Sequence, residues 1–336
     1  MGGGKWDAES YSTSHSERLA SGTPHFAHTE DVRAGRAKGV HESVDPKKVA
    51  GVTSPFAGKP VRESRDSEEH PNSVPVVFIF DVTGSMHRIP QVLQEKLPQL
   101  LQHIKDTAGI EDVQILVGAV GDFFADRTPF QVGFFESDNR IDEQLRSLNL
   151  EGGGGGPDCE SYGLAIRFAA HHTDIDSFSK RGKKGYFFTM GDENLYPTVT
   201  KKEILQVFGI PAQEDESVES LLARAREKWH MIHLFAMDGS YPNATHIHEN
   251  WQRLYGQNFV KVADSSLVCE VVSGFILATE KAMDAAKVAE AMHLTGHERD
   301  VVTNALVPVI NSVPAHIGAS ALPTGHEDGV ADLADA

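Results

Sequence analysis

The sequence predicts an α/β protein with a doubly wound, mostly parallel sheet of six strands and one antiparallel edge strand. Three observations support this fold class. From residue 74 to about residue 282, short apolar runs alternate with amphipathic segments of helical period. The first run is apolar at nearly every position, as in a central parallel strand covered on both faces. Only a short stretch separates the second run from the third, which is too little for a helical crossover and predicts an antiparallel hairpin.

The elements follow in chain order. Apolar runs mark the predicted strands, at residues 74–81, 113–120, 130–135, 185–190, 230–236 and 258–262. Apolar residues at helical spacing mark the predicted helices, at residues 89–101, 141–148, 162–172, 218–228, 245–255 and 265–292. This alternation predicts one domain, residues 74–282.

The two flanks lack such periodicity. Residues 1–73 are rich in Ser, Gly and His with nearly balanced charge, which predicts a flexible N-terminal arm without a core of its own. Short apolar islands in the arm can dock on the domain or on a partner. Residues 283–336 are predicted to form a helical extension and, beyond residue 295, an acidic, mostly disordered tail.

Composition excludes several classes of function. A formal charge of -17 argues against a nucleic-acid-binding surface, which needs Lys and Arg around the phosphates. The two cysteines, Cys159 and Cys269, permit neither a disulfide framework nor a cysteine-based zinc site. The chain shows no signal peptide, myristoylation pattern or membrane-spanning run. We therefore expect a cytoplasmic protein that contacts neither nucleic acid nor membrane.

Oxygen ligands follow the first strand at close spacing. Asp81, Thr83 and Ser85 lie where the groups past the end of a parallel strand project into a ligand crevice. Carboxylate and hydroxyl oxygens suit Mg²⁺, which prefers octahedral oxygen coordination and keeps several waters. The alternative is that Thr83 or Ser85 only caps the following helix.

Asp81-x-Thr83-x-Ser85 after an apolar strand resembles the metal-ion-dependent adhesion site (MIDAS) of von Willebrand factor A (VWA) domains, and the predicted hairpin is similar to the antiparallel edge of that family. The family pattern implies a second Asp after the fourth strand, where this chain has Asp192. The resemblance thus implies Asp81, Thr83, Ser85 and Asp192 as ligands of Mg²⁺, with Mn²⁺ as the alternative ion. A solvated turn is the alternative role of Asp192.

The third loop of the site departs from the VWA pattern. Where the family places a Thr, this chain has five glycines, residues 152–156, similar to a Gly-rich loop of some intracellular bacterial and phage VWA proteins. The loop contact then falls to Gly155, Asp158, Glu160 or Ser161, and spacing does not choose among them. Asp122, past the second strand, is a further expected member of the outer shell.

The resemblance implies an intracellular protein-interaction module of the bacterial or phage type. Its Mg²⁺ would bind an acidic side chain of a partner protein, and the implied partner is a MoxR-type AAA+ ATPase. Two other functions remain open. One is a metal-independent structural or assembly scaffold. The other is a Mg²⁺-dependent phosphatase-like enzyme with Asp81 as the nucleophile. For the enzyme, residues 81–85 resemble the Asp-Lys-Thr-Gly-Thr phosphorylation motif of P-type ATPases. Val82 occupies the position of that motif's lysine, which disfavours the enzyme, so we assign no catalytic residue.

Overall fold

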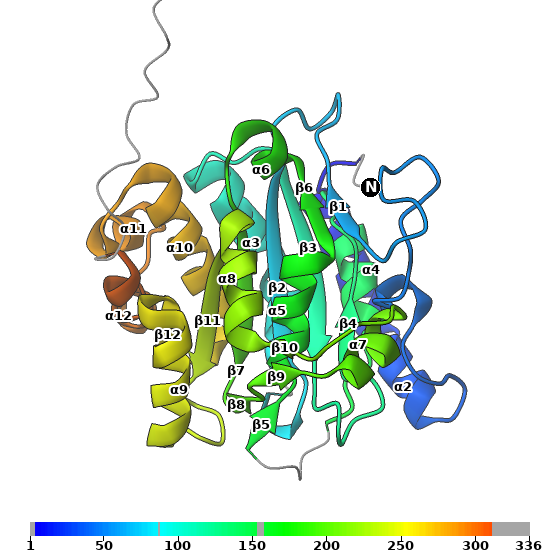
Figure 1. The fold of residues 1–336 in the computed structure, drawn as a ribbon. Helices are drawn as coiled ribbons and strands as arrows, with labels where there is room; N and C mark the ends of the chain where they lie inside the picture. Colours follow the sequence, from blue (N-terminus) through cyan, green and yellow to red (C-terminus); the bar gives the residue numbers. More distant parts are fainter. Residues whose placement is uncertain (1–3, 87, 153–157, 311–336) are drawn as a thin grey trace, which may run out of the picture.

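The computed structural model describes residues 4–86, 88–152 and 158–310, and a six-stranded sheet forms its centre (Figure 1). The strands are β2 (Val74–Asp81), β3 (Val113–Val120), β4 (Phe130–Val132), β7 (Gly185–Gly191), β11 (Trp229–Ala236) and β12 (Phe259–Val262). Their order is β12-β11-β7-β2-β3-β4. Strand β4 is antiparallel to β3, and every other neighbouring pair is parallel. This confirms the predicted fold class, a VWA-like α/β fold.

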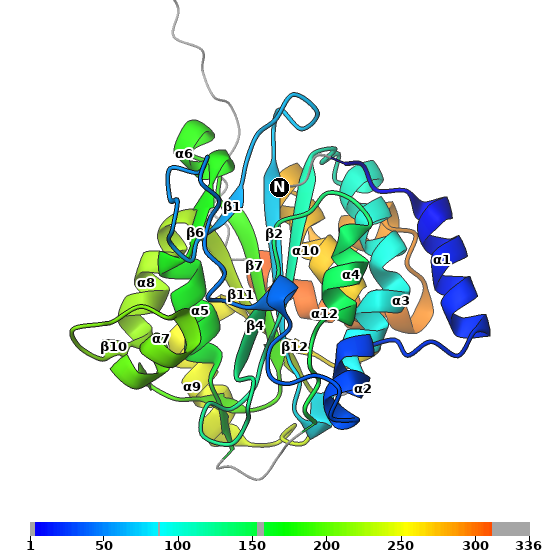
Figure 2. The same ribbon diagram turned by 90° about the vertical axis from the view of Figure 1, so that its right-hand side faces the viewer.

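Helices cover both faces of this sheet (Figure 2). One layer contains α3 (Ile89–Gln102), its π-helical continuation η3 (His103–Thr107), α4 (Arg140–Arg146) and α10 (Val268–Lys281). The other contains α5 (Tyr162–His171), α7 (Lys201–Phe208), α8 (Val218–Lys228) and α9 (Thr245–Tyr255). Along β2, Val76 and Phe78 face the first layer, whereas Val77 and Ile79 face the second. Both faces are therefore buried, which explains the unbroken apolar run.

Short elements link the main ones. They are η2 (Gly84–Met86), β5 (Cys159–Glu160), β6 (Thr173–Ile175), α6 (Asp176–Arg181), β8 (Asn194–Leu195), β9 (Thr198–Val199), β10 (Glu216–Ser217), η4 (Gly256–Asn258) and η5 (Ser265–Leu267). Strand β5 pairs with β8, and β9 pairs with β10. Helices α6 and α7 were not predicted from the sequence. Helix α7 nevertheless has a local signal, since Thr200 and Glu203 form a capping box before it.

The predicted helix over residues 265–292 is interrupted in the structure. Helix α10 ends where Ala282 adopts a left-handed backbone conformation, with φ of 51°. Asp284 then caps a new helix, α11 (Ala285–Ala291). The single long helix was therefore wrong, because a local cap starts a second helix within the same apolar pattern.

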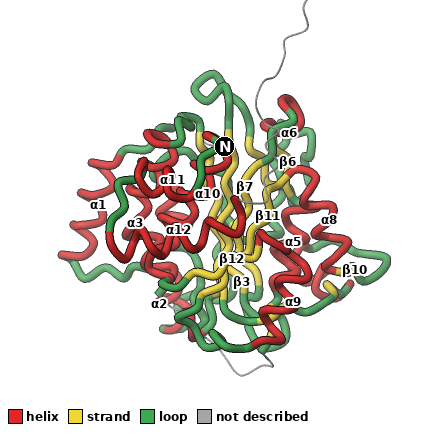
Figure 3. Tube along the Cα trace, turned by 90° about the vertical axis from the view of Figure 1, so that its left-hand side faces the viewer, coloured by secondary structure: helices red, strands yellow, loops and turns green. Residues whose placement is uncertain are grey.

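The prediction of disorder beyond residue 295 is wrong as far as residue 310. Residues Gly296–Ile310 form helix α12, which packs beside α10 and α11 (Figure 3). Its buried side chains include Val302 and Leu306, which belong to the core of the first layer. Burial in that core stabilises a helix that its own sequence specifies weakly. The predicted acidic tail, residues 311–336, lies outside the described residues. Among the described residues, no helix is both long and apolar enough to cross a membrane.

Residues 4–73 pack against the domain and contain regular structure that the sequence analysis did not predict. The elements are α1 (Ala8–Ala20), α2 (Ala27–Arg33), η1 (Glu42–Val44) and β1 (Arg62–Ser64). Helix α1 lies against α3 (Figure 2), where the buried hydroxyl of Tyr11 donates to the carbonyl of Gln94. Strand β1 pairs in parallel with β6. The buried Tyr11 and Val44 belong to the core of the first layer, so the domain supplies the burial that orders the arm.

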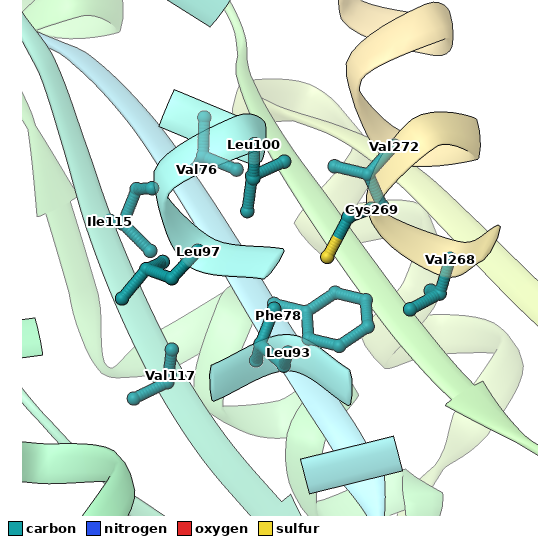
Figure 4. Close-up of a pocket in the computed structure, with 10 residues that line it drawn as sticks. All are labelled: Val76, Phe78, Leu93, Leu97, Leu100, Ile115, Val117, Val268, Cys269 and Val272. Atoms are coloured by element: carbon teal, nitrogen blue, oxygen red, sulfur yellow. The ribbon is translucent and has the colours of Figure 1, made fainter. Parts of the chain in front are cut away.

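A small apolar cavity lies between the sheet and the first helical layer (Figure 4). Its volume is about 10 Å³, and Phe78, Leu97 and Cys269 are among the side chains that line it. A space of this size, without polar groups, does not hold a water molecule stably. Burial raises the pKa of the Cys269 thiol, so Cys269 acts here as a packing residue.

Candidate functional site

Acidic side chains gather where three neighbouring strands end. Strand β2 lies between β3 and β7, with Asp81 opposite Val120 of β3 and Phe80 opposite Met190 of β7. Asp122 follows the end of β3 and Asp192 directly follows β7, so both flank Asp81. The chain leaves β2 toward one edge of the sheet and later returns on its other side. Ligands of open α/β sheets bind at such a reversal of strand order.

Asp81 is fully buried and held by two donors. Its Oδ1 accepts a hydrogen bond from the Thr83 amide at 2.7 Å, and its Oδ2 accepts one from the Tyr162 hydroxyl at 3.0 Å. Burial raises the pKa of Asp81, the charge of Asp192 adds to the rise, and the contacts from Thr83 and Tyr162 oppose it. A carboxylate held in this way is suited to orienting a ligand.

The turn after β7 supplies a second pair of acids. Asp192 is fully buried and accepts a hydrogen bond from the Ser240 amide. A Cβ at Gly239 would lie 2.3 Å from Asp192 Oδ2, so this backbone approaches the carboxylate as closely as glycine allows. Burial, and then the charges of Asp81 and Asp192, raise the pKa of Glu193 to about 8. Glu193 therefore belongs to the acidic cluster at the strand ends, and it was not predicted from the sequence.

Thr83 is the most informative hydroxyl of the site. Its side chain is 3% exposed, and its Oγ1 has no hydrogen-bond partner of normal geometry among the described residues. It therefore does not cap the following helix, which has no side-chain cap. A buried hydroxyl without a partner costs free energy unless a ligand satisfies it. Of the other predicted ligands, Ser85 lies in η2 with its side chain outside the described part of the structure.

Glu160 is the residue of the third loop that joins the acidic cluster at the strand ends. Glu160 is 4% exposed and its Oε2 lacks a partner among the described residues. Burial, and then the charges of Asp81 and Glu193, raise its pKa. Asp158 instead pairs with His246 of α9, at 2.6 Å.

The remaining predicted loop residues have structural partners or are not described. Ser161 Oγ accepts a hydrogen bond from the Phe123 amide at 2.9 Å. Asp122 Oδ1 accepts one from the Phe124 amide at 3.0 Å, and Asp122 is 4% exposed, so it is no solvated turn acid. Gly155 lies outside the described residues.

The oxygen ligands present here fit a hard divalent cation that takes only a few ligands from the protein and the rest from water. Asp81 and Asp192 are buried carboxylates at the ends of adjacent strands, and their mutual repulsion favours a cation or a proton between them. Thr83 Oγ1, which lacks a partner of normal geometry in the part of the chain that the structure describes, adds a neutral oxygen ligand. In the described part of the chain, no three His, Cys, Asp or Glu side chains are grouped to enclose a metal ion. An ion here would therefore depend on the hydroxyl and on water, as Mg²⁺ does.

The raised pKa of Glu193 predicts a pH dependence of stability. The native state holds a proton on Glu193 up to about pH 8, against an ordinary pKa of 4.5. Its contribution to stability is complete below pH 4.5 and is lost as the pH rises through about 8. We expect the metal-free protein to lose stability over this range relative to Glu193→Gln, and Mg²⁺ to reduce the loss. Thermal unfolding at the low and the high end of this pH range, with chelator and with Mg²⁺, measures the loss of stability.

The comparison with Glu193→Gln is necessary because other groups titrate in the same range. Burial lowers the pKa of His172 to about 3, so that residue destabilises the native state as the pH falls below 6.5. This effect is common to both proteins and cancels in their difference. Parallel stability curves for the two proteins would contradict the raised pKa of Glu193.

The strand order and the buried acids define the class of this protein. It is an α/β protein with a VWA-like sheet and with buried acids at the carboxyl ends of its central strands. No protein-family description and no curated protein matches the chain.

Similar solved structures exist at low identity. The pilus adhesin SpaC from Lactobacillus rhamnosus GG aligns over 70% of this chain and 32% of its own chain, at 9% identity and a TM-score of 0.41. Proximal thread matrix protein 1 from the mussel byssus aligns over 61% of this chain and 48% of its own chain, at 12% identity and a TM-score of 0.36. The SpRpn10 VWA domain aligns over 53% of this chain and 81% of its own chain, at 10% identity and a TM-score of 0.31. This chain thus spans about a third of the adhesin. Likeness at this level carries no argument about function, and the fold class rests on the strand order.

Proposed function

We propose that this protein is an interaction module that uses Mg²⁺ in the β2–β7 crevice to bind an acidic side chain of a partner protein. The observation that carries the proposal is the buried Thr83 Oγ1, which has no hydrogen-bond partner of normal geometry among the described residues. It lies two residues after the buried carboxylate of Asp81, whose pKa the charge of Asp192 raises. These three residues would hold the ion, with Ser85 as a further hydroxyl. The ion would supply an electrophilic position for an oxygen ligand from outside.

An acidic partner follows from coordination chemistry. Mg²⁺ takes six oxygen ligands, and the described residues offer too few carboxylates to surround it. Water fills the other positions until a stronger ligand displaces it. A carboxylate is such a ligand, because an anionic oxygen is attracted to the cation and water is neutral. The resemblance to intracellular VWA proteins suggests an AAA+ ATPase of the MoxR type as the partner and the cytoplasm as the compartment.

Substitutions of Thr83 test the metal site without disturbing the fold. Thr83→Val removes the hydroxyl at constant shape, and Oγ1 makes no hydrogen bond of normal geometry to any described residue. We expect calorimetric titration to give a Mg²⁺ affinity at least about tenfold lower than in the wild type, with an unchanged or higher melting temperature. Thr83→Ser is the matched control and keeps the affinity within a few-fold. A lower melting temperature with unchanged affinity would assign the hydroxyl to structure instead.

A metal-independent scaffold is the second candidate function. The raised pKa values of Asp81, Glu160 and Glu193 favour it, because protons can relieve the repulsion between these acids in place of a cation. Chelator discriminates between the two functions. Partner binding that survives complete removal of divalent ions supports the scaffold, and binding that returns only with Mg²⁺ or Mn²⁺ supports the metal-dependent module.

A further inference from the structure

We infer that Tyr162 is the positioning residue for Asp81, an inference that rests on the proposed role of Asp81 at the cation. Tyr162 begins α5, is fully buried and donates its hydroxyl hydrogen to Asp81 Oδ2 at 3.0 Å. The Thr83 amide occupies Asp81 Oδ1 at 2.7 Å. One donor on each oxygen fixes the plane of the carboxylate. Each oxygen still has a second lone pair for water or an ion.

The place of the Tyr162 hydroxyl depends on a missing side chain on the adjacent strand. Gly191 is the last residue of β7, and a Cβ there would lie 1.6 Å from Tyr162 Oη and 3.1 Å from the Cβ of Asp81. Gly191 does not have a positive φ, so backbone conformation does not explain the glycine. The space that the Tyr162 hydroxyl needs explains why this residue is a glycine. Asp81, Tyr162 and Gly191 therefore form one unit drawn from three separate elements.

Helix α9 holds the Tyr162 ring in position. Trp251 packs edge-to-face on Tyr162, with ring centroids 5.3 Å apart, and His233 contacts the same ring at 5.4 Å. His233 and Trp251 stack on each other at 3.4 Å. The indole N–H of Trp251 donates to the carbonyl of Glu193 at 2.9 Å. One side chain of α9 thus supports Asp81 through Tyr162 and also fixes the turn that carries Asp192 and Glu193.

This arrangement gives Tyr162 a defined role. A phenol is protonated at neutral pH even without burial, so the Tyr162 hydroxyl is a donor there. A carboxylate oriented by its neighbours loses less freedom when it binds a cation, and outer-shell partners of this kind typically change metal affinity by about 10–100-fold. Sequence reasoning missed Tyr162 because nothing in the local pattern shows that its hydroxyl reaches Asp81.

Tyr162→Phe tests the inference, with Tyr186→Phe as the matched control. Tyr186 is also buried and donates to a carboxylate, Glu280 at 2.6 Å, but it lies near the opposite end of β7. Calorimetric titration with Mg²⁺ should show an affinity about 10–100-fold lower for Tyr162→Phe and a change under about twofold for Tyr186→Phe. Mg²⁺ should also produce a tyrosine difference spectrum in the wild type and in Tyr186→Phe that is absent in Tyr162→Phe. Equal Mg²⁺ affinity in Tyr162→Phe and wild type overturns the inference.

A second experiment separates this inference from the proposed function. In chelator, the unfolding equilibria of Tyr162→Phe, Asp81→Ala and the double variant form a double-mutant cycle. We expect the effects to be non-additive by about tenfold in the equilibrium constant, because each single change removes the same hydrogen bond. Additive effects overturn the role of Tyr162. If the wild type binds no divalent cation while this coupling persists, the proposed function fails and the orientation of Asp81 by Tyr162 stands.

Discussion

Asp81→Asn is expected to abolish binding of divalent cations while the protein stays folded. Asparagine keeps an oxygen that can accept from the Thr83 amide or the Tyr162 hydroxyl, but it removes the charge that attracts the ion. It also removes the repulsion with Asp192 that the metal-free protein must tolerate. We expect the affinity for Mg²⁺ and Mn²⁺ to fall by at least about 100-fold, and the melting temperature in chelator to stay the same or rise. Calorimetry and thermal unfolding measure the two effects.

Asp158→Asn is the control for Asp81→Asn. It removes one acid from the rim of the same crevice, but the Asp158 side chain is partly exposed and pairs with His246. A change of at most a few-fold in Mg²⁺ affinity is expected, since exposed charges act weakly over distance in solution. Equal losses in the two variants would mean that the general negative field attracts the ion. Unfolding of Asp81→Asn would show that the carboxylate has a structural role. The Asn variant is preferable to Asp81→Ala, which leaves two buried donors without an acceptor.

Arg62→Ala is expected to give the largest loss of stability among the changes considered. Arg62 lies on β1, is 1% exposed and donates to three carbonyl oxygens, those of Gly133 at 2.9 Å, Lys48 at 2.6 Å and Asp45 at 2.6 Å. Its guanidinium also covers the ring of Phe134 at 4.2 Å. Alanine leaves the buried carbonyl of Gly133 and two partly buried carbonyls unpaired, and it leaves a cavity beneath the arm. We expect a loss of about 3–5 kcal/mol in the free energy of unfolding.

Guanidinium unfolding of Arg62→Ala and of Arg36→Ala checks this prediction. Arg36 pairs with Asp31 at 2.7 Å, but its side chain is 65% exposed, so its removal should cost less than about 1 kcal/mol. Arg62→Lys should lie between the wild type and Arg62→Ala, because an ammonium cannot reach three divergent acceptors with the geometry of a guanidinium. A loss below about 1 kcal/mol in Arg62→Ala would show that the arm is not anchored through this residue.

The sheet could be predicted because its strands are apolar on both faces. Residues 74–81 and 113–120 are buried throughout, and such runs are distinctive in a sequence. Helices α1 and α12 could not be predicted in the same way. Helix α1 is rich in Ser and buries only Tyr11, and its clearest local signal is the Asp7 cap, whose Oδ1 accepts from the Glu9 and Ser10 amides. Such helices depend on surfaces supplied by distant parts of the chain.

The residues of the candidate site also fall into those that local sequence predicts and those that depend on tertiary packing. The sequence by itself determined the sheet and the acids that end its strands, Asp81 and Asp192, because strand ends are local features and parallel strands bring them together. Only the tertiary structure decided that Thr83 Oγ1 lacks a partner of normal geometry among the described residues, that Glu160 and Glu193 join the acidic cluster at the strand ends, and that Tyr162 reaches Asp81. The physical reason is that burial, unpaired groups and close approach depend on packing between elements far apart in the sequence.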